Sequence, residues 1–87
     1  MNLGKAIRDV RVKRRITQVD LAKWSNLTQG YLSLVESGKK TPSIEVLVNI
    51  SGAIEVPIAA LVILSCDSGE IPGFMASFQE ECQSQYL

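Results

Sequence analysis

The chain has 87 residues, of which 46% are hydrophobic and only 6% aromatic, so one small domain with a single compact core is expected. Histidine is absent and no glycine-rich phosphate loop is present, so we expect a protein that is not an enzyme and has no cofactor and no metal. No apolar run approaches the roughly 20 residues of a membrane span, and the N-terminus lacks a signal-peptide core, so we predict a cytoplasmic protein that does not bind membranes. The thiols of Cys66 and Cys82 are expected to be reduced, although their spacing alone also allows a disulfide.

The formal net charge is zero, but the charges are segregated along the chain. All nine basic residues lie in the first 40 positions, together with only three acids, which leaves that part at +6. Residues 41–87 carry six acids and no base. One end of the molecule should therefore attract phosphate while the other repels it. A solvated basic helix followed by an acidic tail would give the same pattern, so charge alone does not decide the function.

The first predicted helix covers residues 3–15, because Leu3, Ile7 and Val10 recur at helical spacing. Its opposite face is basic.

Two short helices are then predicted over residues 18–25 and 29–37. Thr17 and Thr28 precede them, and threonine is a favourable N-cap because its hydroxyl accepts hydrogen bonds from the free N–H groups of the first turn. Asn26 between them tolerates the left-handed conformation that ends a helix. The connection is therefore tight, as in a helix-turn-helix.

A fourth helix is predicted after the loop that follows Gly38, with Ser43 as its N-cap. Its buried stripe is predicted to be Ile44, Leu47, Val48, Ile50 and Ala53.

A fifth helix, residues 58–64, follows Pro57, a residue suited to the first turn. This segment is apolar all round. Ile58, Leu61 and Val62 are expected to face the core, and the outward set is Ala59, Ala60, Ile63 and Leu64. Because an exposed apolar patch is normally covered, we expect either a second copy of the chain or its own tail to lie on this helix.

The predicted tail follows a linker, residues 66–73, that is rich in Gly, Ser and Pro. Phe74, Phe78 and Cys82 lie four residues apart in it, which favours a short helix. We therefore divide the chain into a domain of residues 1–65 and a linker and tail of residues 66–87, the latter serving dimerisation or partner binding.

At this point the motifs resemble the lambda-repressor-like (XRE/Cro-type) helix-turn-helix DNA-binding family over residues 3 to about 63. The residues that carry the resemblance are Thr17-Gln18, Asp20-Leu21-Ala22, Leu27-Thr28, Tyr31-Leu32-Ser33, Val35-Glu36-Ser37-Gly38, Pro42-Ser43 and Ala53-Ile54-Glu55-Val56. The resemblance implies an all-α, five-helix domain, here with an added tail helix, and a transcriptional regulator, most similar to small repressors and to controller proteins of restriction-modification systems. It further implies double-stranded DNA as the partner and a homodimer on a near-palindromic operator, with recognition helices about 34 Å apart.

Carried over by position, the resemblance makes Gln29 the main base reader, since glutamine can pair with the N6 and N7 atoms of adenine. Ser33 and Leu34 lie on the same outward side. Gly30 occupies a position where many relatives have a second base-contacting side chain, so fewer side chains are expected to contact bases directly here. Two alternatives stay open: Gln29 as a polar helix start, and Leu34 as a contact to another part of the protein rather than to a thymine methyl.

The resemblance also implies phosphate contacts, which position the protein but do not specify sequence. Gln18 would contact the DNA backbone and brace the recognition helix, and the main-chain N–H groups and lysines after the third helix would grip phosphate. The full expected set is Thr17, Gln18, Thr28, Ser37, Lys39, Lys40 and Thr41. Arg11 and Glu36 occupy the positions of a buried structural ion pair.

The expected dimer interface comprises Ala59, Ala60, Ile63, Leu64, Phe74 and Phe78. The competing interpretation is an antitoxin-type interaction module whose tail binds a second protein. Trp24, at a position where the family usually has a polar residue, is expected to pack on the tail or on a partner.

Overall fold

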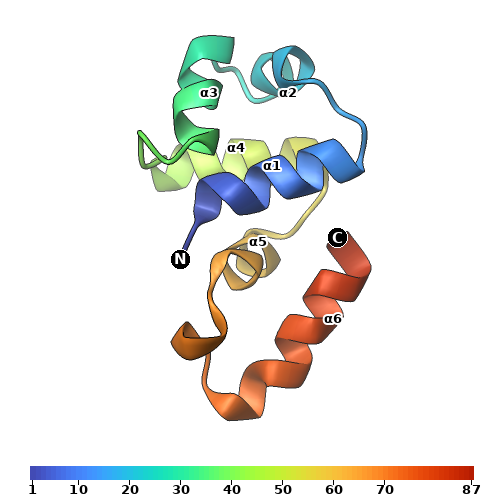
Figure 1. Ribbon diagram of the computed structural model, residues 1–87. Coiled ribbons are helices and arrows are strands. Elements are labelled where there is room, and N and C mark those ends of the chain that lie inside the picture. The colour runs from blue at the N-terminus through green and yellow to red at the C-terminus, as the bar shows by residue number, and fades with distance from the viewer.

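The computed structural model describes the backbone of residues 1–87 and every side chain except that of Ser68. All regular elements in the described chain are helical (Figure 1). They are, in chain order, α1 (Leu3–Lys13), α2 (Gln18–Trp24), α3 (Gln29–Glu36), α4 (Ile44–Ile54), α5 (Ile58–Ser65), the 3₁₀ turns η1 (Ser68–Glu70) and η2 (Gly73–Met75), and α6 (Ala76–Tyr86). The predicted all-α fold with a tail helix is confirmed.

The predicted N-caps are formed by the three hydroxyl side chains expected from the sequence. Thr17 Oγ1 accepts a hydrogen bond from the N–H of Asp20 at 3.0 Å, and Thr28 Oγ1 accepts one from Tyr31 at 3.1 Å. The Ser43 hydroxyl likewise accepts a bond from the fourth helix at 3.2 Å. Each cap satisfies a backbone donor that the helix itself leaves free.

The first helix ends two residues before its predicted end. Arg15 adopts a left-handed conformation with φ 57°, and the N–H of Ile16 bonds back to the carbonyl of Arg11 at 3.0 Å. This is the Schellman pattern of helix termination. Because arginine rather than glycine takes the left-handed position, composition gave no signal for it. Asn26 also adopts the left-handed conformation (φ 58°), as the sequence predicted. Gly38 adopts it as well (φ 80°), a conformation that glycine takes readily.

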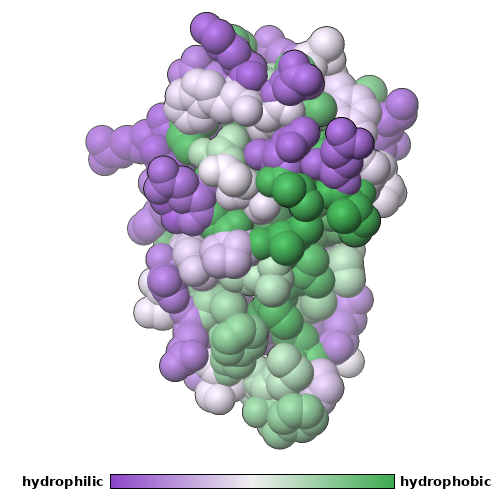
Figure 2. Space-filling view, turned by 180° about the vertical axis from the view of Figure 1, so that it is seen from behind, coloured by the Kyte–Doolittle hydropathy of each residue, from purple (hydrophilic) through white to green (hydrophobic). Residues whose placement is uncertain are grey.

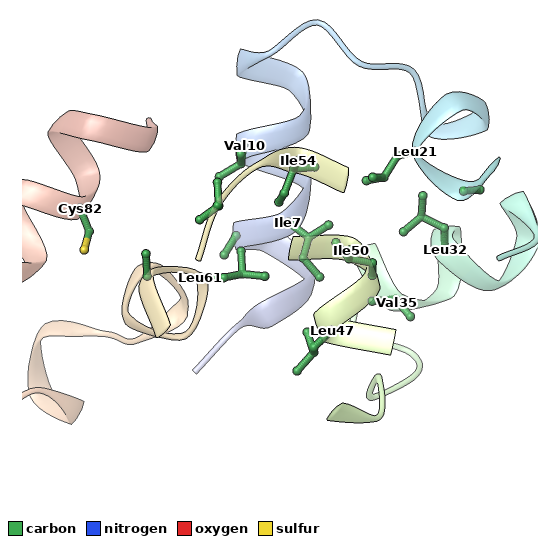
Figure 3. Close-up of a cluster of buried hydrophobic side chains, with 14 residues drawn as sticks. Ile7, Val10, Leu21, Leu32, Val35, Leu47, Ile50, Ile54, Leu61 and Cys82 are labelled. Carbon is green, nitrogen blue, oxygen red and sulfur yellow. The ribbon is translucent and has the colours of Figure 1, made fainter. Parts of the chain in front are cut away.

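The core lies where α1 meets the other helices. In Figure 1, α1 and α4 lie side by side at the centre, with α2 and α3 on one side of them and α5 and α6 on the other. Side chains from all six helices meet in this core (Figure 3). Those fully removed from solvent include Ile7, Val10, Leu21, Leu32, Ile50, Ile54 and Leu61. Each contributes about 1.5–3 kcal/mol by burial.

The predicted buried stripe of α4 is wrong in part. Leu47, Ile50 and Ile54 are buried, but Ile44 is 71% and Val48 51% exposed. The side of α4 that packs on the other helices is thus turned by about one residue relative to the predicted stripe. Which side of an apolar helix faces the core depends on where its neighbours lie.

The tail packs on α5, so the chain itself provides part of the expected cover. Cys82 of α6 is buried in the core cluster, and the Gln79 side-chain amide donates to the carbonyl oxygen of Cys66 at 2.9 Å. Ala60 is only 6% exposed, so the expectation that it faces outward is wrong. The tail packs on α5, an arrangement that the sequence pattern left open.

The three tail residues spaced by four do not share one buried face. Phe74 lies in η2, before α6 begins, and is 85% exposed, whereas Phe78 is 44% exposed. Of the three residues spaced by four, only Cys82 is therefore buried.

Within the described residues, no single helix is long and apolar enough to cross a membrane, and only α4 and α5 taken as a pair, bent by 101°, reach the required length and composition.

Candidate nucleic-acid interface

The helix α3 has one buried and one exposed side. Leu32 and Val35 are buried against the rest of the domain, which fixes the helix on its support. The four residues expected to face bases, Gln29, Gly30, Ser33 and Leu34, are all exposed. A side chain at the first turn of such a helix is free to enter a major groove.

An ion pair joins α1 to the end of α3. Arg11 Nε donates to Glu36 Oε2 at 2.8 Å and Arg11 Nη2 to Glu36 Oε1 at 3.0 Å, a bidentate arrangement. The third donor, Arg11 Nη1, bonds the carbonyl of Ile16 at 2.9 Å. The two charged side chains are only 12% and 4% exposed. The structure therefore brings together the two residues expected to pair, and it uses all three guanidinium nitrogens inside the protein.

Hydrogen bonds extend from this ion pair through Gln18 of α2 to the start of α3. Gln18 Nε2 donates to Glu36 Oε1 at 3.2 Å, and Gln29 Nε2 donates to Gln18 Oε1 at 3.4 Å. The second bond is long and weak, so it holds the Gln29 side chain only loosely. The network orients both glutamines at the start of their helices.

Gly4 is a structural residue that the sequence reasoning missed. The helix α1 approaches the end of α3 so closely that a Cβ atom on Gly4 would lie 2.1 Å from the carbonyl oxygen of Val35. A glycine inside a predicted amphipathic helix was the available signal.

The segment after α3 carries the expected cations in solvent. Lys39, Lys40 and Thr41 are exposed, and the Lys40 ammonium lies 5.6 Å from the ring centre of Tyr31, within range of a cation–π contact. The N–H groups of residues 38–40 bond carbonyl oxygens of Val35 and Leu34. These N–H groups therefore complete the end of α3, while the lysine side chains lie in solvent.

The remaining expected phosphate contacts lie at the helix starts and at the end of α3. Thr17 and Thr28 are exposed while their hydroxyls serve as caps. Ser37 is exposed and donates to the carbonyl of Leu34 at 3.1 Å. Trp24 is 56% exposed on α2.

Among the described residues, no group of three or more His, Cys, Asp and Glu side chains could hold a metal ion. Cys66 and Cys82 are free thiols in the structure. Burial, with a smaller effect from the Glu81 carboxylate, raises the pKa of the Cys82 thiol, which lowers its reactivity.

The sequence was compared with models of known protein families. The family model described as helix-turn-helix, of the lambda-repressor (XRE) type, matches residues 7–61. The chain belongs to the helix-turn-helix family. The matched range of this helix-turn-helix domain contains α2, α3 and α4 complete, with most of α1 and the first half of α5.

Two curated relatives of this helix-turn-helix domain are regulators by name. It is 36% identical over 62 residues to the immunity repressor protein of Bacillus phage phi105, covering 71% of this chain and 43% of that protein. It is 32% identical over 68 residues to the transcriptional regulator ClgR of Mycobacterium tuberculosis, covering 78% of this chain and 58% of that protein. The chain thus spans about half the length of the curated relatives it matches.

Two solved structures of the clp gene regulator ClgR from Corynebacterium glutamicum share the fold. One is 32% identical with a TM-score of 0.72, covering 83% of this chain and 91% of its own. The other is 29% identical with a TM-score of 0.73, covering 95% of this chain and 85% of its own. Because the second match leaves so little of the chain uncovered, it extends into the tail, for which the sequence motifs had no counterpart.

Proposed function

We propose that this protein is a sequence-specific DNA-binding transcriptional regulator that represses from a near-palindromic operator as a homodimer. The observation that carries the proposal is the exposed first turn of α3, held by the bonds from Arg11 through Glu36 and Gln18 to Gln29. Recognition of bases in the major groove requires a polar side chain that is held in position by a rigid part of the protein. The repressor named among the relatives supports the direction of regulation.

The charge distribution supports the same docking. The basic residues lie in α1, in the turn that follows it, in α2 and in the segment after α3, and the acidic tail lies at the opposite end of a molecule 38 Å long (Figure 1). A duplex is therefore attracted to the α3 end and repelled from the α6 end. Selection of bound sequences from a random duplex pool, followed by mobility-shift titration, tests the proposal. Failure to enrich any sequence would contradict it.

We predict that Gln29→Ala weakens binding to the selected operator and relaxes preference at one base pair in each half-site. A bidentate glutamine–adenine contact gives about 1–3 kcal/mol of discrimination, so the preference at that position should fall about 5- to 150-fold. Titration against operators substituted at each position measures it. Gln83→Ala, an exposed glutamine of α6, is the matched control and should leave every preference unchanged. If the two variants lost base-pair preference equally, Gln29 would not be the residue that contacts the base.

The proposed dimer surface is the exposed apolar side of the α5–α6 end. Phe74 and Phe78 are its large exposed side chains, Ala59 of α5 is exposed, and Ile63 and Leu64 are half-buried. Figure 2 shows apolar side chains gathered in a band at the level of α4 and α5 and continuing to this end. Two-fold pairing through such a surface would leave the α3 end of each copy free for one half-site.

We expect the double substitution Phe74→Glu and Phe78→Glu to convert a dimer of twice 9.5 kDa into monomers, because like charges replace the apolar contact. Sedimentation equilibrium measures the mass. The affinity for the operator should also fall, because a monomer binds one half-site without the gain from binding both at once. Ile44→Glu, at a position 71% exposed on α4, is the control for adding charge to an exposed apolar site. A wild-type monomer at micromolar concentration would instead favour the tail as a surface for a second protein, the antitoxin-type alternative.

A further inference from the structure

A recess of about 310 Å³ opens between α1, the start of α2 and the end of α3. Its lining residues are Arg8, Arg11, Gln18, Ser33, Glu36 and Ser37. Two of them, Gln18 and Ser33, also belong to the surface proposed to face DNA. The recess is therefore continuous with that surface and lies beside the recognition helix.

The charge available in the recess comes from one side chain. Arg11 and Glu36 neutralise each other, and the three Arg11 nitrogens already have partners within the protein. Arg8, one helical turn earlier on α1, is exposed and takes part in none of the ion pairs formed by the described residues. The neighbouring carboxylate of Asp9 is paired with Lys5 at 2.8 Å. The lining thus carries a net charge of +1 that depends on Arg8.

The hydrogen-bonding groups of the recess suit an oxyanion. The guanidinium of Arg8 offers donors in a fork that matches two phosphate oxygens. Ser33 is exposed and its hydroxyl adds a further donor, while the Gln18 amide has a second N–H beyond the one it gives to Glu36. Of the carboxylates, only that of Glu36 lines the recess, and it is held by Arg11.

We infer that this recess binds one phosphate of the DNA backbone, with Arg8 supplying the charge and Ser33 and Gln18 adding neutral hydrogen bonds. The inference rests on the proposed DNA binding and names a residue that the sequence reasoning did not include. It assigns Arg11 to the scaffold, because Glu36 neutralises its charge and each of its three nitrogens already donates one hydrogen bond within the protein. It also moves Ser33 from base reading to phosphate binding.

The test compares Arg8→Gln with Lys23→Gln, which removes one exposed cation from the other end of α2. Binding of each protein to a 30-base-pair duplex, about three helical turns, is measured at several salt concentrations, since a phosphate contact does not depend on sequence. Arg8→Gln should flatten the plot of log affinity against log salt by about 1 per bound protomer and weaken binding about 5- to 10-fold at 0.1 M salt. Lys23→Gln should leave the slope nearly unchanged, and Arg8→Lys should restore it.

Equal slopes for wild type, Arg8→Gln and Lys23→Gln would overturn the inference while leaving the proposed function intact. A wild-type protein that binds no duplex at any salt concentration would overturn both. Gln and Arg have similar helix propensities, so thermal unfolding of the Arg8→Gln variant should match wild type and rule out misfolding as the cause.

Discussion

Replacing Glu36 with alanine is expected to lower the free energy of unfolding by about 3 kcal/mol, because it leaves the Arg11 guanidinium without its partner in a site where that side chain is 12% exposed. The same change removes the acceptor of the Gln18 amide, so the start of α2 loses its brace. For a domain of this size the loss corresponds to a fall in melting temperature of about 12–24 °C. Chemical and thermal unfolding followed by circular dichroism measure it.

Two further variants test whether the loss of stability comes from the unpaired buried charge of Arg11 or from the loss of any ion pair. Asp9→Ala breaks the exposed pair with Lys5 and should change stability by less than about 1 kcal/mol. The double variant Arg11→Met with Glu36→Leu removes both charges and should recover most of the lost stability. A double variant as unstable as Glu36→Ala would show that the ion pair itself, and not the unpaired arginine, carries the effect.

Gly4→Ala should destabilise the protein by about 2–3 kcal/mol, whereas Gly52→Ala should stabilise it by up to about 1 kcal/mol. The Cβ at position 4 would lie 2.1 Å from the backbone oxygen of Val35, and backbone cannot move aside as a flexible side chain can. The Cβ at position 52 meets nothing within 4 Å, so only the better helix propensity of alanine remains. Free energies of unfolding for the two variants give opposite signs.

The Gly4 variant also tests whether α1 supports the recognition helix. Displacing α1 from the end of α3 would stretch the bond between Arg11 and Glu36, and operator affinity should fall even at temperatures where the variant stays folded. If Gly4→Ala is as stable as wild type, α1 and α3 do not approach as closely as the structure has them.

Local signals explain why so much of the helix-turn-helix was predictable. Thr17, Thr28 and Ser43 act on N–H groups three residues away, so their effect needs no knowledge of the rest of the fold. Asn26 likewise ends α2 through its own left-handed backbone conformation, which does not depend on distant residues. The exposed position of Gln29 follows from its place in the first turn of a short helix whose apolar residues, Leu32 and Val35, point to the other side.

Interactions between distant segments could not be derived in this way. The side of α4 that is buried, the burial of Ala60 on α5 and the contact between Gly4 and α3 depend on the angles at which helices meet. The sequence segment of α5 is apolar on every side, so periodicity had no contrast from which to choose an outward face.

The sequence by itself therefore determined the helix boundaries marked by caps, the segregation of charge and the presence of a helix-turn-helix, because each depends on neighbours within one turn or on composition. Only the tertiary structure decided that Arg11 also bonds the carbonyl of Ile16 and that Arg8 lines the recess beside α3 without an ion-pair partner among the described residues. Helical periodicity alone does not distinguish two arginines one turn apart on a basic helix, although the family resemblance had singled out Arg11. They differ because a carboxylate 25 positions away reaches one of them and not the other.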